Sequence, residues 1–181
     1  MKVTAHQTRL LGCYLDYNYL EVVDPSQLTV TETFFLETHA NFTSAKQNAL
    51  RGVYFSGNVY ATQGSSIKID PRFVDGTDTV IADEINGGCQ LKLTTARQTV
   101  THALVPSAAF QFDFSATLLL PEIEEVMYSF TAGGAGSRFV AHSAEKDGQT
   151  VTVHFQTPVV GSVTVEVAQA VNGLPHGPDG V

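Results

Sequence analysis

Residues 110–120 carry the pattern that decides the fold class, and they read Phe-Gln-Phe-Asp-Phe-Ser-Ala-Thr-Leu-Leu-Leu. Phenylalanine stands at every second position over 110–114, with polar residues between. Because successive side chains of a β-strand point to opposite faces, this alternation predicts a strand with one buried and one solvated face. The same period of two recurs in other segments, namely 28–36, 52–61, 67–69, 89–94, 150–155 and 163–167.

Strand signals follow one another at short spacing, and helical signals are few. Ser44 is a candidate cap for a short helix ending at Leu50. Pro121 is a candidate first-turn residue of another helix over 121–127, although Val126, Tyr128 and Phe130 could equally begin a strand. No self-similar period is visible, which argues against a solenoid or a propeller. The sequence predicts an all-β fold: an antiparallel β-sandwich, jelly-roll-like or a distorted barrel, with at most one or two short helices.

The length of 181 residues predicts a single β domain over 1–171, followed by a Gly/Pro-rich C-terminal tail over 172–181. A chain of this size buries roughly 70% of its unfolded surface, so it needs no disulfide or metal to be stable. The tail lacks any strand or helix pattern. We expect it either to be disordered or to become ordered against a neighbouring subunit.

The net charge of −8 argues against nucleic acid as a partner, because phosphate binding needs clustered lysine and arginine. No apolar run is long enough to cross a bilayer, so no membrane partner is expected. The first residues lack the apolar core of a signal peptide, which predicts a protein made in the cytoplasm. Cys13 and Cys89 are then expected to be reduced, although the sequence leaves open whether they pair.

Acidic residues gather between Asp70 and Glu84, where Arg72 interrupts them. Carboxylates around a Gly turn are the ligands that calcium prefers, but the spacing does not match an EF-hand loop. We therefore expect a solvated loop here, with a calcium site as the alternative.

Histidines and carboxylates also suggest no metal centre. Glu37 and His39 share a face if they lie on a strand, but a catalytic metal needs a third ligand. His142 and His154 fall on adjacent predicted strands, and we expect both to face solvent. The sequence predicts no metal and no cofactor. It shows no nucleophile motif, and Glu122, Glu124 and Glu125 are expected to mark a helix start or a solvated edge.

Tyr54 and Tyr60 are the candidate ligand-binding residues. Alternation over 52–61 places both on the solvated face of one strand, where a pair of aromatic rings can stack a sugar or contact a partner. The alternative is ordinary packing of half-buried tyrosines.

The last strands, over 139–165, include Asp-Gly-Gln-Thr-Val-Thr-Val-His-Phe at 147–155 and Val-Gly-Ser-Val-Thr-Val at 160–165. This pattern resembles the closing strands of bacteriophage virion proteins of the tail, fibre and head-completion kind. So does a composition rich in Thr, Val, Gly and Ala and poor in charge. The resemblance implies a self-assembling structural protein and assigns no functional residue.

These observations lead to the hypothesis of a non-enzymatic structural or assembly protein. It would be a component of a virion, a homo-oligomer in contact with other assembly proteins. One alternative is a lectin-like carbohydrate-binding module that uses Tyr54 and Tyr60 to bind a glycan. The other is a metal-dependent enzyme that uses Glu37 and His39.

Overall fold

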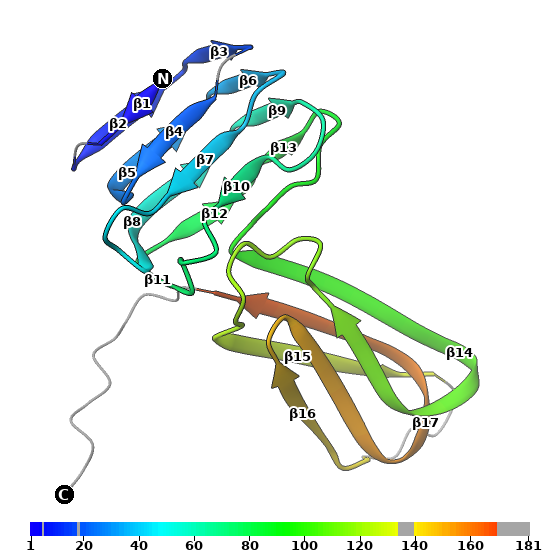
Figure 1. The fold of residues 1–181 in the computed structure, drawn as a ribbon. Helices are drawn as coiled ribbons and strands as arrows, with labels where there is room; N and C mark the ends of the chain where they lie inside the picture. The colour runs from blue at the N-terminus through cyan, green and yellow to red at the C-terminus, as the bar shows by residue number, and fades with distance from the viewer. Residues whose placement is uncertain (5, 18, 134–139, 170–181) are drawn as a thin grey trace, which may run out of the picture.

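The structure is a computed structural model that describes residues 1–4, 6–17, 19–133 and 140–169. Every regular element in these ranges is a β-strand, which confirms the all-β class, and neither candidate helix forms. The described residues accordingly contain no helix that could cross a membrane. Figure 1 shows a stack of short strands in the N-terminal half and a sheet of long, curved strands in the C-terminal half.

The N-terminal half winds through three sheets, called sheets A, B and C here, in which neighbouring strands are parallel. Sheet A consists of β1 (Lys2–Val3), β4 (Leu20–Val23), β7 (Ala40–Thr43) and β10 (Ile67–Ile69). Sheet B consists of β2 (Thr8–Leu11), β5 (Ser26–Thr31), β8 (Ala49–Ser56), β11 (Asp75–Thr77) and β12 (Val80–Ala82). Sheet C consists of β3 (Tyr14–Asp16), β6 (Phe34–Leu36), β9 (Val59–Ala61) and β13 (Ile85–Asn86).

One passage through sheets A, B and C makes a coil, and successive coils stack into a parallel β-helix. A single residue with a left-handed backbone makes each corner from sheet B to sheet C. The four corner residues have positive φ angles of 59°, 52°, 66° and 56°, and they are Gly12, Glu32, Gly57 and Asp83. The corner shifts the inward–outward alternation by one residue, so that Val30, Thr33 and Phe35 all point inward and are fully buried.

Inward-facing side chains fill the coils with an apolar core. The rings of Phe35 and Tyr60 stack with centroids 4.6 Å apart, and those of Phe42 and Phe55 meet edge to face at 5.5 Å. Each of these aromatic side chains is fully buried, and burial of such a ring contributes roughly 1.5–3 kcal/mol to stability.

The sequence argument against a solenoid is wrong. The coils do stack in register, as the ladder from Tyr14 through Phe34 to Val59 shows. They differ in length, however, because the connection from sheet A to sheet B is two residues long at 24–25 but five residues long at 44–48 and at 70–74. Since the coils do not share one length or one motif, their repetition leaves no fixed period in the sequence.

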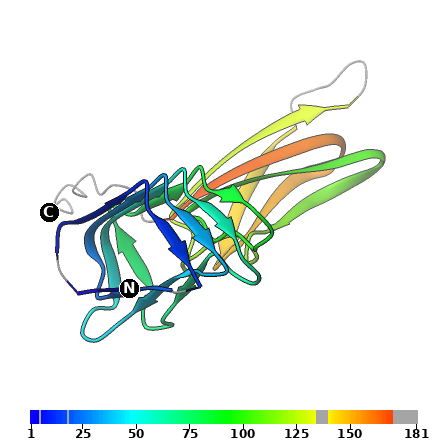
Figure 2. The same cartoon turned by 90° about the horizontal axis from the view of Figure 1, so that it is seen from above.

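The C-terminal half is one antiparallel sheet of four strands: β14 (Thr95–Asp113), β15 (Glu125–Ala132), β16 (His142–Asp147) and β17 (Thr150–Ala168). The long strands β14 and β17 pair along their length and change register between His102 and Ser107, where both bend (Figure 2). One half of β17 pairs with β15 and the other with β16, so the sheet closes over its own core. Phe110, Phe112 and Phe114 are buried there, as the alternation predicts.

The two halves meet at the last coil. Leu93 forms a parallel bridge with Leu118, and Leu119 and Leu120 belong to the core of the coils. The buried side chain of Gln169 stabilises this junction. Its Oε1 accepts a hydrogen bond from the Leu120 N–H at 2.9 Å, and its Nε2 donates one to the Glu122 carbonyl at 2.8 Å.

An antiparallel sandwich over the whole chain is therefore not what the structure shows. Antiparallel pairing is confined to β14–β17, and the sheets of the N-terminal half are parallel. The described residues hold two hydrophobic cores, one in each half. That residues 1–171 form one domain stays a prediction, and the predicted tail over 172–181 lies outside the described residues.

Replacing Gln169 tests the junction. We expect Gln169→Leu to lower the free energy of unfolding by about 2 kcal/mol or more, because the buried Leu120 N–H loses its partner without gaining water. Urea denaturation measures this change. Gln156→Leu is the matched control, since Gln156 is exposed on the surface. Equal unfolding midpoints for the two variants would show that the junction does not depend on this amide.

Candidate functional site

The outer face of sheet B presents rows of side chains that run along the helix axis. Strand pairing places Arg9 beside Thr29, Thr29 beside Tyr54, and Tyr54 beside Val80. Neighbouring strands are about 4.8 Å apart, so an extended ligand lying across them meets a new side chain at each coil.

An open groove of about 570 Å³ follows this face and is lined by Gln7, Arg9, Gln27, Thr29 and Gly52. Gln7, Gln27 and Gly52 stand at equivalent places in three coils, and all have a left-handed backbone, with φ of 59°, 52° and 59°. At Gly52 this backbone conformation favours glycine, and the missing side chain keeps the groove open beside Gln27.

The chemistry of the groove is polar and locally cationic. Two carboxamides offer donors and acceptors, and the Arg9 guanidinium offers a fork of donors suited to carboxylates. Within the described ranges, neither Arg9 nor the nearby Arg51 forms an ion pair with a carboxylate. An anionic ligand would therefore meet an unneutralised guanidinium here.

Of the two predicted ligand-binding tyrosines, only Tyr54 is available. Its side chain is 44% exposed on the outer face of sheet B, next to Thr29 of the groove. Tyr60 is fully buried against Phe35, and its placement on the solvated face is wrong. The reason is the corner at Gly57, which shifts the alternation by one residue between the two tyrosines. Burial, with Glu84 and Cys89 adding to it, raises the pKa of the Tyr60 hydroxyl well above its usual value.

Sheet A presents a different face. Lys2 forms an ion pair with Glu21 at 3.3 Å, and the ring of His39 stacks on Tyr19 with centroids 6.1 Å apart. Burial, followed by the charge of Lys68, lowers the pKa of His39. Glu37 does not share a strand face with His39, because it sits at a left-handed corner with φ of 49°.

The acidic stretch from Asp70 to Glu84 is spread over several elements. Asp70 pairs with Arg72 at 2.7 Å, and the hydrogen bonds from Arg72 hold the pKa of Asp70 well below its usual range. Asp78 makes a turn between β11 and β12. In the described part of the chain, no three His, Cys, Asp or Glu side chains are grouped as metal ligands.

The remaining candidates are also separated. Cys13 and Cys89 are both free thiols, so they do not pair. His142 and His154 lie on paired strands but one step apart in register, so they point to opposite faces. The Tyr128 hydroxyl forms a hydrogen bond with Nδ1 of His142. Oε1 of Glu145 forms a hydrogen bond with Nε2 of His154 at 2.8 Å.

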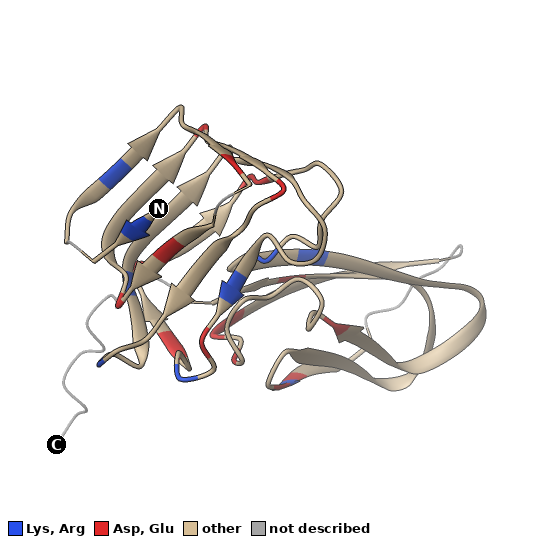
Figure 3. Ribbon diagram, turned by 45° about the horizontal axis from the view of Figure 1, so that its top comes forward, with Lys and Arg blue, Asp and Glu red and all other residues tan. Residues whose placement is uncertain are grey.

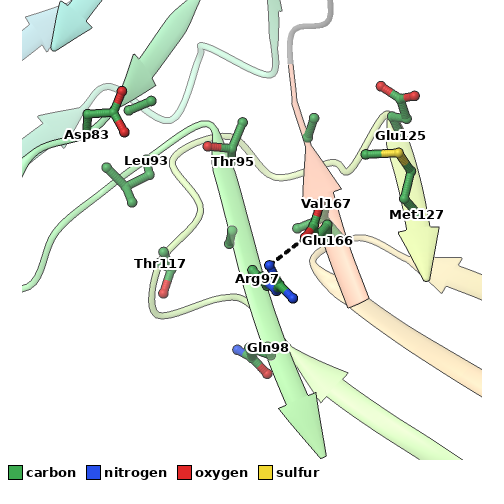
Figure 4. A pocket seen from close by; sticks show the side chains of 13 residues that line it. Asp83, Leu93, Thr95, Arg97, Gln98, Thr117, Glu125, Met127, Glu166 and Val167 are labelled. Atoms are coloured by element: carbon green, nitrogen blue, oxygen red, sulfur yellow. Dashed lines mark ion pairs between the residues drawn. The ribbon is translucent and has the colours of Figure 1, made fainter. Parts of the chain in front are cut away.

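A second groove, of about 510 Å³, lies between the last coil and the C-terminal sheet (Figure 4). Leu93, Met127 and Val167 give it apolar walls. Arg97 is its single basic lining residue and is paired with Glu166 at 3.1 Å, so this groove offers an anionic ligand no unpaired cation.

Inside the coils, Asn58 and Glu84 form a polar pair behind the corner residues. Asn58 accepts a hydrogen bond from the Thr33 N–H at 2.9 Å, and its Nδ2 donates to the Val30 carbonyl and to Oε1 of Glu84. Burial raises the pKa of the Glu84 carboxyl to about 8, even though the hydrogen bond from Asn58 favours the ionised form.

The raised pKa makes stability depend on pH. Glu84 is protonated in the folded chain below about pH 8, but in the unfolded chain it ionises near pH 4.5. Its contribution to the free energy of unfolding is therefore complete below pH 4.5 and is lost as the pH rises towards 8. We expect Glu84→Gln to flatten the decline in unfolding free energy between pH 5 and 8, measured by chemical denaturation. Glu37→Gln, at an exposed corner, is the control that should keep the wild-type decline. The same slope in both variants would contradict a protonated Glu84.

No family model matches the chain, and no solved structure matches it. Over 174 residues the chain is 32% identical to the Arabidopsis thaliana protein named Polygalacturonase QRT3. The match covers 91% of this chain and 35% of that protein, so the chain spans about a third of the length of the curated relative it matches.

This similarity corrects the function predicted from the sequence. The prediction of a bacteriophage structural component located in the virion is wrong, because the relative is a plant protein named for an enzyme that acts on a polysaccharide. The relative's name, which is that of an enzyme, also does not support the predicted non-enzymatic role. The resemblance of residues 139–165 to virion strands is not tested by these comparisons.

Proposed function

We propose that this chain is the glycan-recognising part of a carbohydrate-active protein, and that the groove on sheet B binds an acidic polysaccharide of the polygalacturonate class. The observation that carries the proposal is the groove itself, where a guanidinium and two carboxamides line up across coils next to an exposed tyrosine ring.

Each group has a counterpart in such a polymer. The Arg9 fork can hold a carboxylate through two parallel hydrogen bonds. Gln7 and Gln27 suit hydroxyl groups, since each amide both donates and accepts. The Tyr54 ring gives an apolar surface for a sugar ring, with its hydroxyl left in water.

Charge favours this face for an anionic ligand. The chain as a whole has a net charge of −8, which repels polyanions, but Arg9 and Arg51 both lie on sheet B. The relative named for polygalacturonate chemistry points to the same class of polymer.

Recognition, rather than cleavage, is what the groove supports. Glycoside hydrolysis uses a pair of carboxyl groups that flank the scissile bond. None of the groove's lining residues is Asp or Glu. In this proposal, the activity implied by the relative's name would belong to another surface or to other parts of a longer protein.

Titration calorimetry with oligogalacturonides tests the proposal, with neutral cello-oligosaccharides as the comparison ligand. We expect binding of the acidic oligomer alone. Arg9→Ala should weaken it roughly tenfold or more, since a hydrogen bond to a charged group contributes about 1.5–3 kcal/mol. Tyr54→Ala should weaken it severalfold.

Lys68→Ala is the matched control, because it removes one positive charge from sheet A and leaves sheet B intact. It should bind as the wild type does. If oligogalacturonides do not bind, or if Lys68→Ala loses as much affinity as Arg9→Ala, the groove on sheet B is not the site.

A further inference from the structure

The outer face of sheet C carries an apolar row that no described element covers. Strand pairing places Tyr14 beside Phe34, Phe34 beside Val59, and Val59 beside Ile85. The rings of Tyr14 and Phe34 stack with centroids 5.4 Å apart and planes 4° apart. Tyr14 and Ile85 are 62% and 53% exposed, so the row is open at both ends.

A second apolar row runs beside the first, from Leu36 to Ala61. Both rows face outward because the residues between them, Phe35 and Tyr60, fill the core. A continuous exposed apolar surface of this kind is uncommon on soluble proteins unless it meets a partner.

The charged side chains that border this face all have the same sign. The corners and strands of sheet C, at 12–17, 32–38, 57–64 and 83–88, contain no Lys, Arg or His. Four exposed acids lie on them, namely Asp16, Glu32, Glu37 and Asp83. The lysines and arginines of the coils lie outside these segments, and Figure 3 shows acidic segments at several turns of the β-helix.

We propose that the outer face of sheet C binds a basic amphipathic helix of another protein, with the helix lying across the strands. Its apolar stripe packs on the row from Tyr14 to Ile85, and its lysines and arginines reach the acids at the corners. A helix rises about 5.4 Å per turn, close to the strand spacing of about 4.8 Å, so one apolar side chain per turn meets each coil.

A second copy of the chain does not fit the same face as well. A symmetric dimer would place Asp16, Glu32, Glu37 and Asp83 against the same acids of its partner, and like charges in an interface oppose association. The charge pattern therefore selects a partner of opposite sign.

The test measures the binding of a synthetic Leu/Lys peptide with helical amphipathic spacing to the full chain. Fluorescence anisotropy reports the binding. We expect the peptide to bind, and a peptide of the same composition in scrambled order to bind at least tenfold more weakly. The double variant Tyr14→Ser/Ile85→Ser should weaken binding at least tenfold. Glu32→Gln/Asp83→Asn should weaken it severalfold and reduce its dependence on salt.

Leu104→Ser is the matched control, because Leu104 is 91% exposed on the C-terminal sheet and lies outside the proposed surface. It should leave binding unchanged. Equal binding of the scrambled peptide would overturn the proposal, since charge alone would then explain it. A dimer in light scattering that dissociates in the Tyr14→Ser/Ile85→Ser variant would assign the face to a second copy instead.

Discussion

The left-handed corner between sheets B and C is the constraint on which the N-terminal half depends. One residue turns the chain from one sheet to the next, and four such residues stack from Gly12 to Asp83. Because the turn is so short, it brings the next side chain inward and fixes which residues of sheet C reach the core. Three short strands per coil can then enclose one apolar interior, although none of them is long enough to be stable alone.

The same corner places polar groups inside the coils. Asn58 follows Gly57 and hydrogen-bonds the backbone of the preceding coil, at the Thr33 N–H and the Val30 carbonyl. These two backbone groups flank the corner residue Glu32, where the chain leaves sheet B and the buried Thr33 N–H would otherwise lack a partner. Glu84 occupies the equivalent place one coil further on and is held in a setting that favours its neutral form.

Stacking in register also sorts surface chemistry by sheet. Each outward position repeats at every coil, so a row takes the character of the residues that occupy it. Sheet B collects amides, hydroxyls and arginine, whereas sheet C collects aromatic and aliphatic side chains between acids. The β-helix thus presents chemically different faces around one core, and the C-terminal sheet covers the end of its last coil.

The sequence by itself determined the all-β class, the buried phenylalanines of 110–114 and the exposure of Tyr54, because these follow from alternation within one strand. It could not determine the parallel coils, since strand direction depends on contacts between residues far apart in the chain and the coils differ in length. Nor could it place Tyr60 in the core. The corner before Tyr60 shifts the inward–outward alternation by one residue, and the alternation can be extended past a corner only when the geometry of that corner is known. The groove from Gln7 to Gly52 exists only once three coils are stacked, and so the tertiary structure alone decided it.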